Sequence, residues 1–381
     1  MSYFLFASDS FKGTISSARA AELLGDAARE FFPEAKTVGL EVADGGEGTV
    51  DAMVASAGGS LCSVRVHDPL GRQINARYGL LGDGRAVIEM AAASGLPLLA
   101  AGERDPRVTS TFGTGELIQD ALDRGVRDVS LAIGGSATND GGMGCMRALG
   151  ARFLDCDGDE LRGVGEDLLR VARIDLSSMD ARIAQTSFHV MCDVDNPLLG
   201  ERGSAFVFAP QKGASPEVVE ELERGMQSYA RVLERTFAGF DAMASGMGAA
   251  GGLGAAAYAF LGARLLPGIE QVLDLLNFDD LLKGCDLCVT GEGHADAQSA
   301  HGKVISGVAA RCRAAGVPCV ALVGGMNADA CELEACGVDV LMPTVLDAGP
   351  LERVLEHAER NYSLAARRLF GLMRIGTKVV E

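Results

Sequence analysis

The chain opens with an apolar run, a polar loop and then apolar residues at helical spacing. The run extends from Tyr3 to Ala7 and the loop from Ser8 to Ser16, and the apolar stripe consists of Ala20, Leu23, Leu24, Ala27 and Phe31. A short apolar run is typical of a buried strand, and a stripe with a 3.6-residue period is typical of an amphipathic helix. We therefore expect a strand, a loop and a helix at the start of the chain.

The same alternation of strand and helix returns, with greater regularity, after about Leu281. The pattern predicts strands in CDLCVTGEG, Pro318–Val323 and Val338–Met342, and helices at Val304–Ala315, near Ala328–Cys336 and from Leu351 onward. Such alternation is typical of a parallel sheet covered by helices. Since the first residues have the same pattern, we expect both ends of the chain to share one doubly wound parallel-sheet domain.

The middle of the chain has a different pattern. Apolar and polar residues alternate from Cys62 to Glu89, with turn signals at Pro69–Gly71 and Gly82–Gly84, which predicts an antiparallel hairpin or meander. Beyond it, the pattern predicts a helix at Glu116–Arg124, a strand at Val129–Ile133 and a long helix at Pro216–Phe237.

Length supports a division into two domains. A chain of 381 residues exceeds the usual size of one hydrophobic core. We expect residues 1–62 and 282–381 to form one domain and residues 63–281 to form a second α/β domain.

Charge and composition exclude some classes of protein. The formal net charge of −18 excludes the basic footprint of a nucleic-acid-binding protein and disfavours binding to an acidic membrane. The sequence has no signal-peptide pattern and no apolar stretch of membrane-spanning length, and its ten cysteines fit a reducing compartment. We expect a cytoplasmic protein. Cys285 and Cys288 form a C-x-x-C on a predicted strand, where they point to opposite faces, so we expect them to be structural.

The 50 glycines are grouped in clusters, and the most prominent cluster is Gly134–Gly144. It follows a predicted strand and precedes a helix, so its backbone N–H groups could bind an anion at the helix N-terminus. A tight strand-to-helix connection would give the same pattern. The segment fits neither the P-loop nor the dinucleotide-binding fingerprint. Its candidate ligand-binding residues are Gly134, Gly135, Ser136, Thr138 and Asn139, with Asp140 as a candidate metal ligand.

Two further glycine-rich segments resemble this one. Thr109–Gly115 precedes a helix and adds Thr111, Gly113 and Thr114 as candidates, and Gly246–Gly254 adds Gly251 and Gly252. For the second segment, close helix packing through small residues is an equally good interpretation. Three such segments in one chain favour an elongated polyphosphate ligand such as ATP.

A fourth segment, Thr290–Lys303, follows a predicted strand of the parallel sheet. Ligands of open α/β sheets bind beyond the carboxyl ends of the strands. Glu292 and Asp296 are candidates for Mg²⁺ and Lys303 for neutralising a phosphate. Gly291 and Gln298 are candidate binding residues of the same segment.

Two segments near the N-terminus combine acids with glycines or lysine. Asp9, Ser10 and Lys12 follow the first strand, where a lysine could bind a phosphate or a substrate carboxylate. Asp44 is a candidate metal ligand, and Gly45 and Gly46 follow it in a glycine-rich turn. Capping of a helix by acids is the alternative for this turn.

The segment Cys192–Leu198 contains two aspartates two residues apart. In an extended chain Asp193 and Asp195 share a face, which suits Mg²⁺ binding or work as a base on a hydroxyl. The alternative is an ordinary turn, because Asp-Asn-Pro initiates turns.

Taken together, these segments closely resemble the bacterial glycerate kinase family. The resemblance covers nearly the whole chain through SDSFKGT, ADGGEGT, AAASG, FGTGELI, GGSATNDGG, CDVDNP, PQKGA, AAGGLGAA and TGEGHADAQSAHGK. It implies a flavodoxin-like domain and a restriction-endonuclease-like domain, with the active site in the cleft between them. It also implies ATP and Mg²⁺ as cofactors, D-glycerate as substrate and 2-phosphoglycerate as product.

For such a kinase we expect in-line phosphoryl transfer, in which positioning and charge neutralisation supply most of the catalysis. Asp193 is the candidate base, and Lys12 and Lys303 are the candidates for binding the carboxylate or the transferred phosphoryl group. Formation of 3-phosphoglycerate, a related hydroxy acid as substrate, or a non-catalytic sensor of nucleotide or hydroxy acid are alternatives. The sequence leaves the oligomeric state open.

Overall fold

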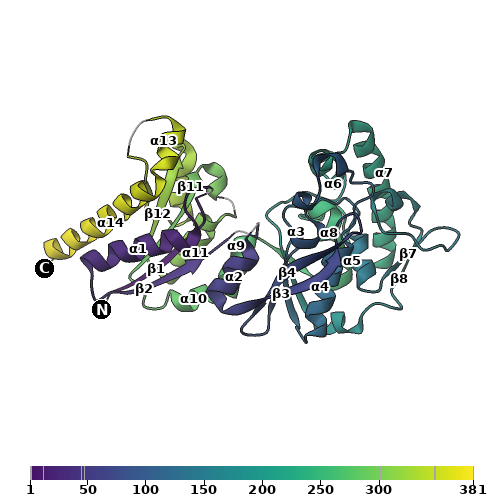
Figure 1. The fold of residues 1–381 in the computed structure, drawn as a ribbon, viewed down its shortest axis with the longest axis horizontal. Coiled ribbons are helices and arrows are strands. Elements are labelled where there is room, and N and C mark those ends of the chain that lie inside the picture. The colour runs from purple at the N-terminus through teal and green to yellow at the C-terminus, as the bar shows by residue number, and fades with distance from the viewer. Residues whose placement is uncertain are drawn as a thin grey trace. The chain divides into compact units, whose positions relative to one another are not determined.

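The computed structural model describes residues 2–11, 13–43, 45–46, 48–300, 302–346 and 349–380, except for the side chains of residues 298 and 377–380. The fold is mixed α/β, as predicted. The chain divides into two compact units (Figure 1). Unit 1 contains both chain ends, Met1–Asp44 and Ile269–Glu381, and unit 2 is Gly45–Gly268.

The sheet of unit 1 is entirely parallel and has the strand order β13-β12-β11-β1-β2. In chain order within this sheet, the arrangement is 2-1-3-4-5, the order of flavodoxin-like doubly wound sheets. The direction of winding reverses between β1 and β11, so the helices on either side of this point diverge and leave a crevice at the carboxyl ends of the two strands. The strands are β1 (Tyr3–Ser8), β2 (Lys36–Glu41), β11 (Leu287–Ala295), β12 (Cys319–Met326) and β13 (Val340–Pro343).

Helices cover both faces of this sheet. Side chains alternate along β11, so Leu287 and Val289 face the core formed with α1 (Ser17–Phe31) and α14 (Ala358–Val380). Cys288 faces the other side, where α11 (Val304–Ala315) packs against β11. The thiol of Cys285, just before β11, lies near the carbonyl oxygens of Leu287 in β11 and Tyr3 in β1.

Unit 2 contains a mixed sheet with the order β10-β9-β6-β5-β4-β3. The strands β3, β4 and β5 form the predicted antiparallel meander, and β5, β6, β9 and β10 are parallel. The carboxyl ends of the parallel strands therefore lie along one edge of the sheet. The strands are β3 (Gly59–His67), β4 (Gln73–Leu81), β5 (Ala86–Glu89), β6 (Asp128–Ala132), β9 (Ser187–Met191) and β10 (Arg264–Leu266).

Helices also cover both faces of the unit 2 sheet. The Tyr78 hydroxyl donates to Asp120 of α4 (Phe112–Asp123) at 2.8 Å, whereas the next residue, Gly79, faces Val54 of α2 (Thr49–Ala57). The large core of unit 2 is completed by α5 (Met143–Ala148), α7 (Pro216–Thr236) and α8 (Ala249–Leu261). The remaining elements are β7 (Arg152–Leu154), β8 (Arg173–Asp175), α3 (Ala91–Ser94), α6 (Ser204–Phe208), α9 (Gly268–Leu275), α10 (Phe278–Leu281), α12 (Glu332–Cys336) and α13 (Leu351–Glu356).

The compact units begin and end at different residues from the predicted domains. β3 was divided by the predicted boundary at residue 62, but the whole strand pairs with β4 in unit 2. The segment after Ile269 packs on unit 1, where a Cβ on Gly307 of α11 would contact Ile269 at 2.6 Å. A change in hydrophobic period marks where one type of element gives way to another. Here each boundary between the units lies at a lower residue number than the predicted boundary.

Two predicted elements have different limits in the structure. The helix predicted from Glu116 begins at Phe112, so Gly113 and Thr114 lie in its first turn. The loop predicted from Thr290 is still strand as far as Ala295, because β11 continues along β12 after β1 has ended at Ser8.

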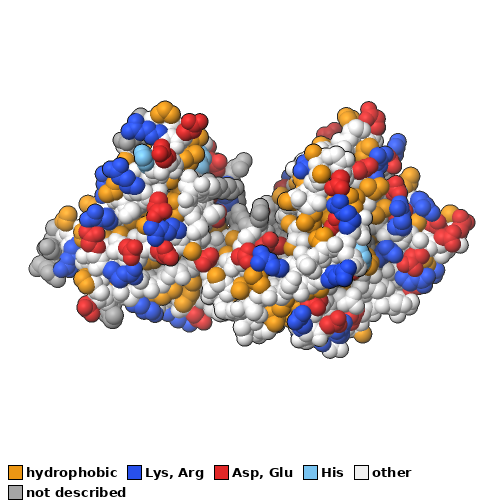
Figure 2. All heavy atoms as spheres, in the orientation of Figure 1, with side chains coloured by type: hydrophobic (Ala, Val, Ile, Leu, Met, Phe, Trp, Pro, Cys, Tyr) orange, Lys and Arg blue, Asp and Glu red, His pale blue; other side chains and the backbone are white. Residues whose placement is uncertain are grey.

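The surface carries charges of both signs. Acidic and basic side chains are interspersed over the face shown in Figure 2. Among the described residues, no helix is long and apolar enough to span a membrane.

Candidate active site

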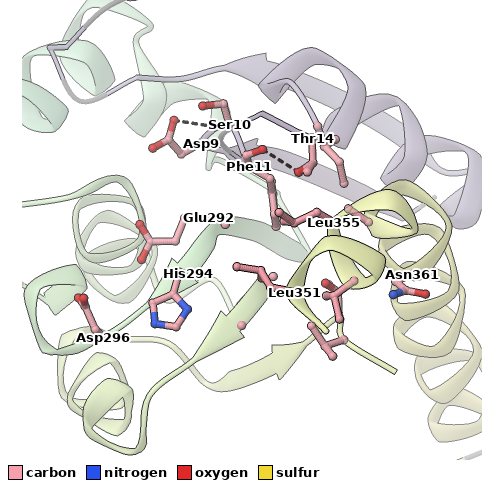
Figure 3. Close-up of a pocket in the computed structure, with 18 of the residues that line it drawn as sticks. Asp9, Ser10, Phe11, Thr14, Glu292, His294, Asp296, Leu351, Leu355 and Asn361 are labelled. Carbon is pink, nitrogen blue, oxygen red and sulfur yellow. Dashed lines mark hydrogen bonds between the residues drawn. The ribbon is translucent and has the colours of Figure 1, made fainter. Parts of the chain in front are cut away.

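A cavity of about 560 Å³ opens in unit 1 at the carboxyl ends of β1, β11 and β12. It lies at the point where the winding of the sheet reverses, which is where ligands of such sheets bind. Figure 3 shows carboxylates along one side of it and apolar side chains along the other. The predicted residues that line it are Asp9, Ser10, Glu292, Asp296 and Lys303.

Glu292 is the most buried of these acids, with only 6% of its surface exposed. It lies on the part of β11 that extends beyond the end of β1. Its Oε1 atom is buried without a hydrogen-bond partner. Burial raises the pKa of Glu292, and the Ser299 side chain and then the nearby Lys303 ammonium oppose this shift. A buried carboxylate oxygen of this kind is suited to a cation.

The other acids of the cavity are held by local hydrogen bonds. Asp9 Oδ1 accepts the N–H of Ser10 at 2.6 Å, and Asp296 Oδ1 accepts the N–H of Ser299 at 3.2 Å. Lys303 occupies the N-cap position of α11, at the positive end of that helix. The cavity therefore combines several carboxylates with a lysine and a helix N-terminus.

In unit 2 the segment Gly134–Gly144 connects β6 to α5, as predicted. Gly134 and Gly135 are exposed, and Gly135 adopts a φ of +71°, which favours glycine. The Gly135 carbonyl accepts the N–H of Leu96, and the Ala137 N–H donates to the Ser94 carbonyl, both at 2.9 Å. The segment AAASG thus holds the exposed end of this loop from one side.

Asp140 lies at the centre of the buried end of the loop. Its two oxygens accept hydrogen bonds from the N–H groups of Thr111, Gly142 and Gly144 and from the Thr111 hydroxyl, at 2.7–3.2 Å. Burial raises the pKa of Asp140, and these hydrogen bonds oppose the shift. The backbone N–H groups at the N-termini of α4 and α5 therefore bind the carboxylate of Asp140, which belongs to the chain itself. We leave it out of the proposed metal ligands.

Lys212 is the residue of this region that the sequence analysis did not select. It is 1% exposed, and its Nζ atom donates to Ser136 Oγ at 2.7 Å and to the Thr138 carbonyl at 2.6 Å. Burial lowers its pKa to about 7, and the Asp140 carboxylate opposes this shift. The one available signal was a lysine among small residues in PQKGA. In its protonated form Lys212 brings a positive charge to the Gly134–Gly144 loop.

The loop also contains two buried donor groups without partners, Thr138 Oγ1 and Asn139 Nδ2. The carbonyl oxygen of the Asn139 side chain accepts the Ser204 hydroxyl at 3.3 Å. Unsatisfied buried polar atoms are rare and are usually paired by a ligand or water. Lys212 holds Thr138 through its carbonyl oxygen, and Asn139 is the next residue in the chain.

The glycines of the other two segments make close contacts within the protein. A Cβ on Gly113 would lie 1.9 Å from the His67 carbonyl oxygen, and a Cβ on Gly251 would lie 2.0 Å from that of Thr138. The Thr114 hydroxyl bonds to Ser94 at 2.7 Å. Gly252 adopts a φ of +92° against Gly141. Close packing through small residues, the alternative interpretation of Gly246–Gly254, therefore describes Gly251 and Gly252, and Gly113 makes a contact of the same kind.

Asp193 and Asp195 have different surroundings. Asp193 Oδ1 accepts the Gly268 N–H at 2.7 Å, at the carboxyl end of β9. Asp195 is exposed and forms an ion pair with Arg202 at 2.8 Å. Gly45 lies beside Met191, the last residue of β9.

The predicted residues fall into one group in each unit. Unit 1 brings together the acids and Lys303 around its cavity, whereas the Gly134–Gly144 loop, Gly45, Gly251 and Lys212 lie along the strand ends of unit 2. Gly291 pairs with Ser8 of β1. Lys12, Asp44 and the Gln298 side chain lie outside the described residues. The predicted position of the active site, between the domains, stays a prediction.

No group of three or more His, Cys, Asp or Glu side chains able to hold a metal occurs among the described residues. Mg²⁺ commonly binds one or two protein carboxylates together with water and substrate phosphates. Glu292 and Asp296 fit this mode, because they lie around one cavity and Glu292 Oε1 has no protein partner.

Comparisons with known proteins agree over the full length. The profile of the glycerate kinase family matches residues 4–374. The chain is 42% identical to the glycerate 2-kinase of Escherichia coli (strain K12), over 98% of each chain, and 41% identical to the glycerate kinase of Bacillus subtilis (strain 168), over 97% of each. A crystal structure described as that of putative glycerate kinase 2 from Salmonella typhimurium LT2 matches with a TM-score of 0.90 and 42% identity, covering 99% of each chain.

Proposed function

Because the chain belongs to the glycerate kinase family, we propose that it transfers the γ-phosphoryl group of ATP to D-glycerate and releases 2-phosphoglycerate. The observation that carries this proposal is the full-length similarity to the glycerate 2-kinase of Escherichia coli, at 42% identity. Both substrates are anionic, whereas the chain has a net charge of −18. The site must therefore reverse the sign of the charge locally.

Two lysines among the described residues lie near the two groups of site residues and can supply the positive charge that anionic substrates require. Lys303 lines the cavity of unit 1, and Lys212, when protonated, places a buried ammonium against the Gly134–Gly144 loop. In the proposed mechanism, the exposed backbone of Gly134 and Gly135 contacts an anionic substrate group, and Lys212 holds the next residues of the loop in place. Lys12 is proposed as a further cation.

Glu292 and Asp296 would hold Mg²⁺ in the proposed enzyme. When bound, this ion would neutralise charge on the phosphates of the nucleotide. The buried Glu292 oxygen without a partner supports this assignment.

Asp193 is proposed to orient the acceptor hydroxyl and to take its proton. The hydroxyl oxygen forms a bond to the γ-phosphorus, the bond from that phosphorus to the β,γ-bridging oxygen breaks, and ADP leaves. The hydrogen bond from Gly268 to Asp193 Oδ1 fixes the orientation of the carboxylate. Positioning and charge neutralisation supply most of the rate enhancement in such reactions.

ADP release from the purified enzyme tests the function. We expect ADP to form from Mg-ATP only when D-glycerate is added, and Asp193→Asn to lower kcat by about 100-fold or more, the usual contribution of a general base. Asp195→Asn, at the exposed ion pair two residues away, is the matched control and should retain activity. Asp193→Asn with wild-type turnover would remove that residue from the chemistry.

A ³¹P spectrum of the product tests the regiochemistry. The expected product is 2-phosphoglycerate, and accumulation of 3-phosphoglycerate would contradict this part of the proposal. Tartronate and longer sugar acids, tested in the same assay, show whether a related hydroxy acid is a better substrate.

A further inference from the structure

The cavity of unit 1 has an apolar half that the proposed chemistry of acids and lysine does not use. Phe11, Leu351 and Leu355 line this half, opposite the carboxylates of Asp9, Glu292 and Asp296 (Figure 3). Ile15 also lines the cavity. Phe11 and Ile15 belong to the buried core and are fixed in place.

Helix α13 forms the wall of the apolar half and contains no buried residue. Leu351 and Leu355 are four residues apart and therefore share a face of this helix, yet they are 69% and 46% exposed. Leaving large apolar side chains in water costs free energy, and exposed apolar groups that line a cavity are typical of ligand-binding surfaces.

Glycines leave the strand side of the cavity without bulky side chains. Gly293, Gly324 and Gly325 contribute to its lining at the ends of β11 and β12. Gly324 lies so close to the neighbouring strand that a Cβ would come within 2.3 Å of the Gly293 carbonyl oxygen. The cavity is therefore a space with apolar side chains on one wall and bare backbone on another, which suits a flat ring.

The two substrates of the proposed reaction differ in their ability to fill this space. Glycerate has a carboxylate and two hydroxyls on three carbons, and its apolar surface is limited to one CH and one CH2 group. ATP has a planar base, a ribose and phosphates, and a cavity of about 560 Å³ lies within the usual range for small-molecule and cofactor sites.

We propose that the apolar half of this cavity binds the adenine base of ATP, with the base lying against Leu351 and Leu355 of α13. The polar half, with Asp9, Ser10 and Lys303, then faces the ribose and the phosphates. This assignment rests on the proposed function for the identity of the nucleotide and adds the location of its base.

Direct binding of Mg-ATP, measured by calorimetry, tests the assignment separately from catalysis. We expect the double variant Leu351→Ser/Leu355→Ser to bind Mg-ATP about tenfold more weakly than the wild type, because two apolar contacts are lost. Binding of Mg-tripolyphosphate, which has no base, should stay within about twofold, and so should the KM for glycerate. The matched control is Leu372→Ser on α14, 65% exposed and outside the cavity lining, which should leave both affinities unchanged.

Each outcome decides the assignment. Unchanged ATP affinity in the double variant, equal losses for ATP and tripolyphosphate, or a wild type that binds no ATP would overturn it. A wild type that binds ATP through Leu351 and Leu355 but forms no phosphoglycerate would contradict the proposed function and leave the base site standing. Because both leucines are exposed, we expect the double variant to fold, with a circular dichroism spectrum that matches the wild type.

Discussion

Lys212 shows how one buried charge can organise a loop. Its side chain is almost completely buried, and its Nζ atom donates hydrogen bonds to Ser136 Oγ and the Thr138 carbonyl. A lysine in such a position has its charged form disfavoured by burial, so its protonation depends on the surroundings. This makes it a residue whose effect on stability should change with pH.

We expect Lys212→Met to remove a pH dependence of stability. The pKa of Lys212 is about 7 in the folded protein and near 10.5 when the chain is unfolded. Between these pH values the unfolded chain binds a proton that the folded chain lacks, so wild-type stability should rise with pH relative to the variant, by up to about 1.4 kcal/mol per pH unit. Urea unfolding at pH 7, 8 and 9 measures this difference.

Lys283→Met is the control, because Lys283 is an exposed lysine with a surface ion pair. Its unfolding free energy should follow the wild type across the same pH range. If the profile of Lys212→Met also runs parallel to the wild type, the low pKa of Lys212 is wrong.

At the scale of elements, the glycine-rich segments show the limit of sequence reasoning. Strands and helices with a clear period were predicted well, and α11 has the predicted bounds Val304–Ala315. The role of Gly113 was not predictable, because glycine is required wherever the backbone approaches another group, whether that group is a ligand or a neighbouring carbonyl. Lys212 was missed because burial of a lysine depends on tertiary packing.

Gly113→Ala tests the packing role of the first turn of α4. The new Cβ would lie 1.9 Å from the His67 carbonyl oxygen, so backbone must shift, and we expect a loss of about 3 kcal/mol or more in the free energy of unfolding. Gly102→Ala is the matched control, because its Cβ meets no heavy atom within 4 Å and its change should stay within about 0.5 kcal/mol. Thermal unfolding of both variants gives the comparison. Equal midpoints would show that α4 adjusts at little cost.

At the scale of the whole molecule, each unit has its own hydrophobic core. The shared sheet of the two chain ends was predictable, because strand and helix alternate in the same way at both ends. The boundaries between the units were not predictable, because they depend on tertiary contacts. Gly307 contacts Ile269, far away in the sequence, and the whole of β3 pairs with β4.

Hydrogen exchange on a pair of core variants tests the independence of the units. Leu24 in α1 and Leu117 in α4 are both fully buried, and replacing either by alanine should cost about 2–5 kcal/mol. We expect Leu24→Ala to speed exchange mainly in β1 and β11, and Leu117→Ala mainly in β6 and β9, because regions of a protein can open separately. Equal acceleration of all four strands in both variants would show that the molecule unfolds as one unit.

Asp140 joins two stretches of chain, its own loop and the segment of Thr111, through four hydrogen bonds from Thr111, Gly142 and Gly144. The Thr111 hydroxyl is the side-chain donor among them, so replacing Asp140 leaves buried donors without their acceptor, and replacing Thr111 removes one bond from a buried carboxylate. Such a loss costs more than the bond itself contributes. Thr111 and Asp140 therefore depend on each other. A chimaera that takes the Thr111 segment from one relative and the Asp140 segment from another will fold only where both parents share this arrangement.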